Sequence, residues 1–343
     1  MELTDEQEEY LDNVYLMKAM LFTEYGSPDL LELKEVEQPV PGDDEVLVKV
    51  HASSINEWDW SFIHGKPFIS RLAYGLRKPR KRILGADIAG WVEDVGANVR
   101  KFQVGDEVFA DQWDAWGGFA EYVCAGEDVL VRKPVNLTFA QAAAVPQAGI
   151  LALHGLQSTG EIKPGQRVLV NGAGGGVGTF AIQIAKSIGT EVTGVDHTCK
   201  LETMRSLGAD HVIDYTREDF TKSGQQYDLI LDVAGYRSMS DYKRTLSSTG
   251  IYVMVGGASG RIFQAMFLSL WGSVTRKSRK IRVLVSRSTE DLAYLKRLIE
   301  AGNVVPVIDS HYPLSEVPAA YRRFGEGQHT GKIVITIDED ALA

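Results

Sequence analysis

The sequence predicts an α/β protein in which a doubly wound, parallel-sheet domain is inserted into a β-rich domain. Three observations lead to this prediction. A run of glycines joins a strand-like segment to a helix-like segment near the middle of the 343 residues. Apolar strands then alternate with helices as far as residue 287. Short strands with glycine turns fill the first third of the chain, and one more strand comes near its end.

The order of these elements divides the chain into parts. Residues 1–16 are acidic and precede a second methionine, so we expect them to be an N-terminal extension. Residues 17–139 and 288–343 are assigned to the β-rich domain, and residues 140–287 to a dinucleotide-binding domain. Two domains are expected at this length, because a single hydrophobic core rarely grows beyond about 250–300 residues.

Local patterns place the individual elements. In the β-rich part we expect strands at Ala19–Thr23, Leu31–Val36, Glu45–Ser53, Ile88–Val95, Glu107–Ala110, Phe119–Val123, Val129–Arg132 and Ile333–Ile337. The parallel sheet is expected to continue through His211–Asp214, Leu229–Val233, Ile251–Val255 and Ile281–Val285. Thr138 and Gln141 have the spacing of a capping box, which predicts the start of a helix. Further helices are expected at Thr289–Ala301 and Leu314–Phe324.

Composition excludes several classes of protein. The hydrophobic content of 44% and charged content of 24% are ordinary for a globular protein. A net charge of −10 argues against general binding of nucleic acids or anionic membranes. The two cysteines, Cys124 and Cys199, are too few for a disulfide framework or a four-cysteine zinc site, and they suit a reducing cytoplasm. No apolar run has the length of a membrane span and no signal-peptide pattern begins the chain, so we expect a cytoplasmic protein.

Two basic clusters interrupt the acidic background, at Arg77–Arg82 and at Arg276–Lys280. Nucleic-acid binding uses such patches, but aromatic residues are not interleaved with these, and each cluster precedes a buried strand. We interpret both clusters as solvated loops. A part in attracting an anionic cofactor, or in binding nucleic acid, is the alternative.

The mid-chain glycine stretch has the pattern of a phosphate-binding loop. The strand Val168–Asn171 leads into the glycines, a helix is expected over Thr179–Ile188, and a second strand ends at Asp196. Glycines let the backbone approach a diphosphate, the helix N-terminus offers free N–H groups, and the acid can bind ribose hydroxyls. Ala173 replaces the first glycine of the G-x-G-x-x-G pattern, so a tight turn alone is the alternative. We expect a dinucleotide to bind at Gly174, Gly175, Gly176, Val177 and Gly178.

Five motifs extend this interpretation: Gly85–Gly90, Val104–Phe109, Gly174–Gly178, Leu207–Tyr215 and Gly331–Ile335. In this order they resemble the medium-chain dehydrogenase/reductase superfamily, and within it the zinc-independent quinone oxidoreductase branch that includes zeta-crystallin and enone reductases. The resemblance runs from Met17 to about Ile337. It implies a GroES-like catalytic domain built from both chain ends, a Rossmann domain between them, and the nicotinamide in the cleft. It also implies homodimers formed through the outer strand of the Rossmann sheet, near residues 282–285.

The resemblance further implies that no zinc is bound. Zinc-dependent relatives hold a catalytic zinc with a cysteine, a histidine and a second cysteine, and these positions are Asn56, Ala86 and Gln147 here. Amide and methyl groups do not replace thiolate or imidazole ligands. Reduction of an acceptor that is already electrophilic, a quinone or an α,β-unsaturated carbonyl, is then favoured over alcohol oxidation.

Asn56 is the candidate catalytic residue, as a donor that stabilises a developing oxyanion. A turn residue bonded to its own backbone is the alternative. The tyrosine that some quinone reductases have five residues later is Ser61 here, and the threonine that several relatives have near the nicotinamide is Leu151. Trp58 and Trp60 either line an apolar substrate pocket or pack in the core.

Two signals for the choice of cofactor point in opposite directions. Asp196 lies where NAD enzymes hold the ribose 2′-hydroxyl, and a carboxylate there repels the extra phosphate of NADP. Lys200 and Tyr215 match positions that contact this phosphate in NADPH-dependent quinone reductases. Val233 and Gly256, at the ends of two later strands, complete the expected cofactor-binding residues. We expect NADPH, with NADH as the alternative.

The sequence therefore predicts an enzyme, a zinc-independent NAD(P)H-dependent oxidoreductase that transfers hydride to a quinone or an α,β-unsaturated carbonyl. Two alternatives stay open. One is a metal-free carbonyl or alcohol dehydrogenase, and the other is a non-enzymatic scaffold that binds the cofactor or associates with nucleic acid. The expected partners are a small-molecule acceptor and a second copy of the chain.

Overall fold

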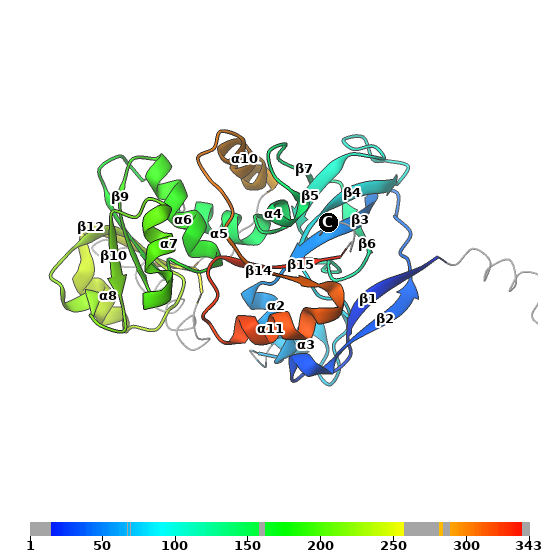
Figure 1. Cartoon of the computed structure of the whole chain (residues 1–343), viewed down its shortest axis with the longest axis horizontal. Coiled ribbons are helices and arrows are strands. Elements are labelled where there is room, and N and C mark those ends of the chain that lie inside the picture. Colours follow the sequence, from blue (N-terminus) through cyan, green and yellow to red (C-terminus); the bar gives the residue numbers. More distant parts are fainter. Residues whose placement is uncertain are drawn as a thin grey trace, which may run out of the picture.

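The molecule has two lobes that meet along a central helix. It is known from a computed structural model that describes residues 15–66, 68, 70–157, 162–256, 281–283 and 289–337. A parallel sheet with its helices forms one lobe and a mainly antiparallel sheet forms the other, at opposite ends of the long axis (Figure 1). Helix α5 (Pro146–Gln157) lies between the two lobes.

The first lobe is doubly wound, as the sequence predicts. Its six strands have the order β10-β9-β8-β11-β12-β13, and each neighbouring pair is parallel. The strands are β8 (Arg167–Asn171), β9 (Glu191–Asp196), β10 (His211–Asp214), β11 (Tyr227–Asp232), β12 (Leu246–Met254) and β13 (Ile281–Val283), and the helices among them are α6 (Gly176–Ser187), α7 (Leu201–Ser206) and α8 (Met239–Thr245). The order of strands reverses between β8 and β11, and ligands of such sheets bind at this point, beyond the carboxyl ends of the strands.

The second lobe is built from both ends of the chain. A seven-stranded sheet has the order β14-β15-β3-β4-β5-β7, with β6 paired to β3. Its strands are β3 (Glu45–Ser54), β4 (Asp87–Val95), β5 (Glu107–Asp111), β6 (Tyr122–Gly126), β7 (Val131–Arg132), β14 (Ile308–Pro313) and β15 (Lys332–Thr336). Strand β15 pairs with β3, with Val334 opposite Ser54, so the last strand returns to the first part of the chain as predicted. Strands β1 (Leu16–Phe22) and β2 (Leu31–Glu37) form a separate hairpin.

Short helices cover the second lobe and its junction with the first. They are α2 (Glu57–Ile63), α3 (Ser70–Tyr74), α4 (Phe139–Ala143), α10 (Thr289–Glu300) and α11 (Val317–Gly325), with 3-10 turns at Pro28–Leu30, Thr198–Lys200, Phe220–Lys222 and Leu314–Glu316. The predicted capping box is present, because Thr138 Oγ1 accepts the Gln141 N–H and Gln141 Oε1 accepts the Thr138 N–H. Helix α2 has only seven residues, too few to produce a periodic apolar stripe that sequence reasoning could detect.

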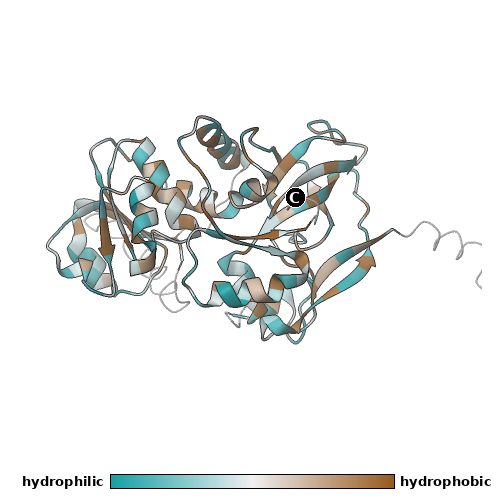
Figure 2. Cartoon of the chain, in the orientation of Figure 1, coloured by the Kyte–Doolittle hydropathy of each residue, from teal (hydrophilic) through white to brown (hydrophobic). Residues whose placement is uncertain are grey.

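Each lobe has its own hydrophobic core. The first core packs α5 and α6 against the parallel sheet and includes Leu153 and Phe180. The second lies within the β-rich lobe and includes Phe22 and Ile88. Each such side chain stabilises the fold by about 1.5–3 kcal/mol when it leaves water. Figure 2 shows hydrophilic residues over the outward face of α11 and apolar residues along the strands.

Several sequence expectations concern regions that are only partly described. The basic cluster at 276–280 and most of the expected extension lie outside the described residues, and the outer strand expected at 281–285 is described for 281–283 only. In the other cluster the five basic side chains are exposed, as expected of a solvated loop. Within the described ranges, no helix combines the length and the apolar character needed to cross a membrane.

Candidate active site

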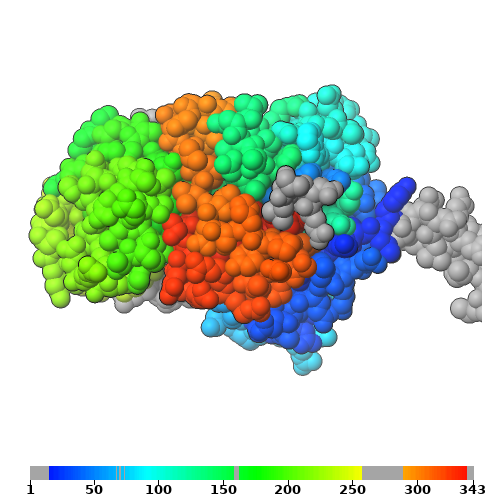
Figure 3. All heavy atoms as spheres, in the orientation of Figure 1, coloured from blue at the N-terminus to red at the C-terminus, as the bar shows by residue number. Residues whose placement is uncertain are grey.

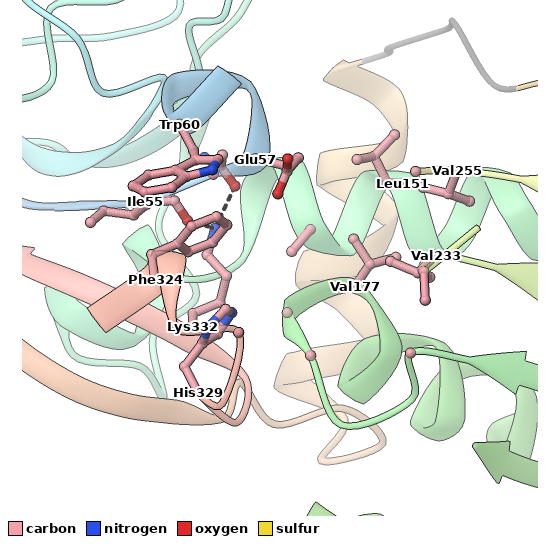
Figure 4. Close-up of a pocket in the computed structure, with 18 of the residues that line it drawn as sticks. Ile55, Glu57, Trp60, Leu151, Val177, Val233, Val255, Phe324, His329 and Lys332 are labelled. Carbon is pink, nitrogen blue, oxygen red and sulfur yellow. Dashed lines mark hydrogen bonds between the residues drawn. The ribbon is translucent and has the colours of Figure 1, made fainter. Parts of the chain in front are cut away.

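A cavity of about 1160 Å³ lies between the two lobes, beyond the carboxyl ends of the parallel strands. The C-terminal segment, orange to red in Figure 3, packs between the green parallel-sheet lobe and the blue N-terminal region. Figure 4 shows that the two walls differ in character. The parallel-sheet side and α5 contribute Leu151, Val177, Val233 and Val255. The β-rich side contributes Ile55, Glu57, Trp60, Phe324, His329 and Lys332.

The glycine loop closes the cavity on the parallel-sheet side. Gly172, at φ +87°, turns the chain out of β8, and Gly175 is the N-cap of α6. A Cβ atom at Gly178 would lie 2.2 Å from the Gly172 carbonyl oxygen, so a larger residue would push the helix away from the strand. A Cβ atom at Gly175 would meet nothing closer than 3.6 Å. The space before the helix N-terminus is therefore open, and it fits the diphosphate of a dinucleotide.

Asp196 is turned inward onto this loop. Its Oδ2 accepts the Gly174 N–H at 2.8 Å, and its Oδ1 accepts the His197 N–H at 2.8 Å. Lys200 Nζ lies 3.7 Å from Asp196 Oδ1 and donates to the Gly327 carbonyl at 3.2 Å. The carboxylate is thus already engaged by backbone donors, and a buried cation stands beside it.

The structure brings most of the predicted cofactor residues to the same cavity. Those that line it are Gly175, Gly176, Val177, Asp196, Lys200, Tyr215, Val233 and Gly256. The other two stabilise the loop without lining the cavity. Gly174 donates its N–H to Asp196, and Gly178 packs closely on Gly172.

A buried polar network lies on the opposite wall, around Asp87 at the start of β4. This carboxylate accepts hydrogen bonds from Ser54 Oγ at 2.7 Å, Asn56 Nδ2 at 2.9 Å, Gln147 backbone N at 2.9 Å and Lys332 Nζ at 3.2 Å. Asp87 directly follows Ala86. Asn56 and Gln147, two of the residues predicted at zinc positions, therefore bond to one carboxylate, and the third, Ala86, directly precedes it.

Lys332, the first residue of β15, places an ammonium group in this network. Its side chain is only 4% exposed. Nζ donates to the Ile55 carbonyl at 2.9 Å and to Asn56 Oδ1 at 2.5 Å, in addition to Asp87. These contacts use all three N–H groups of an ammonium. They also determine how the Asn56 amide is turned, with its oxygen toward the cation and its nitrogen toward the carboxylate.

Asp59 adds a second carboxyl group to the cluster. It is fully buried, and it accepts the Asn56 N–H at 3.1 Å and the Gly85 N–H at 3.4 Å. Burial raises the pKa of Asp59 to about 7, and the neighbouring charge of Asp87 adds to this rise against the backbone hydrogen bonds. Below neutral pH, the Asp59 carboxyl group is therefore protonated in the folded protein.

Aromatic rings form the rest of the β-rich wall (Figure 4). The Trp60 ring lies 4.3 Å from the His64 ring and 6.0 Å from the Phe324 ring, centroid to centroid, and Phe324 stacks on His329 at 4.8 Å. Burial lowers the pKa of His329 to about 4, and the ammonium of Lys200 adds to this shift. The imidazole is therefore neutral near pH 7, and the rings of Trp60, Phe324 and His329 offer a flat, uncharged surface within this wall.

Some cavity-lining residues carry buried polar atoms for which the described part of the chain offers no hydrogen-bond partner. They are Gln147 Nε2, His329 Nδ1, Asn171 Oδ1 and Arg237 Nε. A buried donor or acceptor without a partner is costly, so such atoms indicate groups that a ligand satisfies. Across the described ranges, no three His, Cys, Asp or Glu side chains are grouped so that they could hold a metal ion.

Comparison with known proteins identifies the family. Residues 42–135 match the family model described as an alcohol dehydrogenase GroES-like domain, and residues 207–335 match the one described as a zinc-binding dehydrogenase. The quinone oxidoreductase of Coxiella burnetii has the same fold, with 31% identity and a TM-score of 0.83 over 94% of this chain and 100% of that chain. The chain belongs to the medium-chain dehydrogenase/reductase superfamily, in its zinc-independent quinone oxidoreductase branch.

Two curated relatives in this superfamily are reductases by name. The chain is 35% identical over 331 residues to 2-methylene-furan-3-one reductase of Solanum lycopersicum. It is 34% identical over 331 residues to the chloroplastic NADPH-dependent alkenal/one oxidoreductase of Arabidopsis thaliana. Both alignments cover 93% of this chain and 79% of the relative. The predicted resemblance, and the GroES-like and Rossmann lobes that it implies, are confirmed.

Sequence reasoning missed Asp87, Asp59 and Lys332 as members of the site. A signal was present, because Asp87 directly follows Ala86, and Lys332 directly follows Gly331, within two of the motifs that identified the family. What the sequence lacks is any indication that these residues touch, since 245 positions separate Asp87 from Lys332.

Proposed function

We propose that this enzyme reduces quinones or α,β-unsaturated carbonyl compounds with hydride from NAD(P)H and without a metal ion. One observation carries the proposal. A single cavity pairs a glycine loop that fits a dinucleotide with the Asn56 amide, which is predicted at a zinc position of zinc-dependent relatives, and with the buried Lys332 ammonium bonded to it. The names of the relatives, a furanone reductase, an alkenal/one oxidoreductase and a quinone oxidoreductase, support the same reaction class.

The two walls of the cavity have different roles, one in binding the cofactor and the other in stabilising charge on the acceptor. When bound, the reduced nicotinamide supplies a hydride to the acceptor. The loop around Gly175 holds the diphosphate at the N-terminus of α6. The apolar wall of Leu151, Val177, Val233 and Val255 excludes water from the reacting groups.

The opposite wall stabilises the charge that develops on the acceptor. As hydride reaches a carbon atom of the acceptor, the π-electron pair shifts toward the carbonyl oxygen. The Asn56 amide is the donor for this oxygen, because preorganised donors stabilise an oxyanion most where water is excluded. A proton from water completes the two-electron reduction.

A panel of acceptors tests this function. We expect NADPH oxidation with a naphthoquinone and with an enone, and little oxidation of simple alcohols by NADP⁺. Activity should survive dialysis against a chelator, since an amide, a methyl group and an amide are not zinc ligands. Faster alcohol oxidation than enone reduction, or activity that is lost on chelation and restored by zinc, would overturn the proposal.

The proposed cofactor is NADPH. Lys200 and Tyr215 line the cavity beside Asp196 and would hold the 2′-phosphate. The Asp196 carboxylate already accepts two backbone N–H groups, so its repulsion of a phosphate is partly offset. NADPH dependence in the name of the alkenal/one oxidoreductase supports this choice.

We further propose a homodimer and a cytoplasmic location. Strand β13 is at the edge of the parallel sheet, and an edge strand is a template for pairing with a second copy. Cys124 and Cys199 are both free, which suits a reducing compartment.

A further inference from the structure

Beside the residues predicted at the zinc positions, Asn56, Ala86 and Gln147, lies a cation of this chain's own, the Lys332 ammonium. It bonds directly to Asn56 Oδ1 and to Asp87, the residue after Ala86. The other oxygen of Asp87 accepts the backbone N–H of Gln147 at 2.9 Å. The ammonium is therefore connected by one hydrogen bond to Asn56, by two to Gln147, and by one to the residue that follows Ala86.

We propose that the side-chain amides of Asn56 and Gln147 form a two-donor site for the carbonyl oxygen of the acceptor, and that Lys332 is the positioning residue that orients and polarises it. This inference rests on the proposed function and names the groups that bind the reacting oxygen. Asn56 and Gln147 touch the acceptor and are catalytic residues, whereas Lys332 acts through Asn56.

Each of the two side-chain amides has at least one N–H group that no described residue accepts. The Asn56 nitrogen uses one N–H on Asp87, and its second N–H has no partner among the described residues, although Asn56 lines the cavity. Gln147 is 3% exposed and lines the same cavity, and its Nε2 is buried without a partner. Asn56 is tied to the Asp87 carboxylate through its side-chain amide and Gln147 through its backbone N–H, so both residues start from one point of the cavity wall.

Charge in the network favours an oxyanion at this wall. The ammonium at 2.5 Å from Asn56 Oδ1 withdraws electron density from the amide, which strengthens its N–H donors. The positive charge of Lys332 offsets the negative charge of Asp87, and burial raises the pKa of Glu57 on the same wall, so both effects reduce repulsion of a second anion. Because the site is buried, these interactions are screened less than they would be in water.

The reaction balances without further groups. Hydride adds to the electrophilic carbon of the acceptor, the π pair moves to the carbonyl oxygen, and the two amides donate to the resulting oxyanion. Water then delivers one proton to the reduced acceptor, and the two electrons of the reduction come with the hydride that a bound nicotinamide would supply.

A phenol of visible absorbance, such as 4-nitrophenol, tests the site without any turnover. Its phenolate resembles the anion of a reduced quinone, so binding to the wild-type enzyme should lower the pKa of the phenol. Gln147→Leu should reverse most of that shift. Gln112→Leu is the matched control, because Gln112 Nε2 is also buried without a partner but does not line the cavity.

Turnover supplies the second measurement. We expect Gln147→Leu to lower kcat about 100-fold, the loss found when one oxyanion donor is removed, with the Kd for NADPH within twofold. The decrease in kcat should be larger for simple enones than for quinones. The quinol anion is delocalised, so it depends less on hydrogen bonds to its oxygen. A role in packing alone predicts the same loss for both acceptors.

Lys332 requires a paired design, because Lys332→Met alone leaves a buried carboxylate unpaired and endangers folding. The double variant with Asp87→Asn removes both charges, and Lys332→Arg keeps the cation. We expect the double variant to fold, to bind NADPH and to lose about 100-fold in kcat, with partial rescue by arginine.

A kcat within threefold of wild type in both Gln147→Leu and the folded double variant, with no change in the phenol pKa, would overturn this inference. If wild type reduces no acceptor, the proposed function fails instead, and the phenol measurement still decides the site.

Discussion

At the scale of single residues, the chemistry of the cavity depends on a few buried ionisable groups rather than on the net charge of −10. Asp87, Asp59 and Lys332 share one region of low exposure, and two carboxyl groups compete for one ammonium. The group that gives up its charge is Asp59, because burial raises its pKa to about 7 and the ammonium bonds to Asp87.

Asp59 should make stability depend on pH. Its folded-state pKa of about 7 exceeds the ordinary value of 3.8, so the folded protein binds the proton more tightly than the unfolded chain does. The free energy of unfolding should therefore fall as pH rises from about 4 to about 7, by at most about 1.4 kcal/mol per pH unit, and level off above. Urea denaturation of wild type and Asp59→Asn at pH 5, 6, 7 and 8 measures the difference. His329 makes the free energy of unfolding rise between about pH 4 and 6.5. This contribution is the same in both proteins, so it cancels in the difference between them. Parallel curves for the two proteins would contradict the assignment.

Lys200 should select the phosphorylated cofactor. A charge-assisted contact to a phosphate contributes about 1.5–3 kcal/mol, so Lys200→Ala should weaken NADPH binding about 10- to 100-fold. NADH affinity should change by less than threefold, because NADH has no 2′-phosphate for Lys200 to contact. Fluorescence titration with both reduced cofactors measures this. Lys222→Ala, which alters an exposed lysine of the same lobe, is the control. Equal losses for NADPH and NADH would show that Lys200 supports the loop rather than the phosphate.

At the scale of elements, the glycine loop contains one glycine that the packing of α6 requires and another, three residues earlier, that leaves room for a ligand. Gly178 lies where α6 crosses β8, and its missing side chain makes room for the Gly172 carbonyl. Gly175 caps the same helix, and its missing side chain leaves space in the cavity. Two glycines of one motif therefore serve different purposes.

Alanine substitutions should distinguish these purposes. Gly178→Ala forces a contact of 2.2 Å with backbone, so we expect it to lower the free energy of unfolding by more than about 2 kcal/mol. Gly175→Ala should cost about 1 kcal/mol or less, as an N-cap change, and yet weaken NADPH binding at least tenfold. Thermal unfolding and cofactor titration of both variants check the two results. Unchanged NADPH affinity in Gly175→Ala would mean that the diphosphate does not approach this residue.

At the scale of the whole molecule, the two lobes are tied together close to the cofactor loop. The Gly331 N–H donates to the Gly174 carbonyl at 2.9 Å. Gln183 of α6 makes two hydrogen bonds with Val305, at 2.9 and 2.8 Å. The segment that carries Lys332 into the β-rich sheet thus also touches the Rossmann lobe, so the position of the ammonium depends on how the lobes meet.

The proposed dimer is a prediction at this scale. Light scattering should give twice the mass of the chain at micromolar concentration. If β13 pairs across the interface, amides of residues 281–283 should exchange slowly in the dimer and faster when dilution favours the monomer. A monomeric mass at all concentrations would exclude the dimer, and a dimer in which these amides exchange freely would place the interface elsewhere.

The sequence by itself determined the doubly wound lobe and the glycine loop, and it predicted which residues stand at the zinc positions. These features depend on local patterns, because strand and helix periodicity and glycine spacing act over a few neighbouring residues. Only the tertiary structure decided the partners of Asn56, since Lys332 is 276 positions away and reaches it only when β15 pairs with β3. The inward turn of Asp196 was also decided there, by a backbone N–H 22 positions earlier. Buried polar groups take the partners that the fold brings within reach, and the linear order of the residues does not contain that distance.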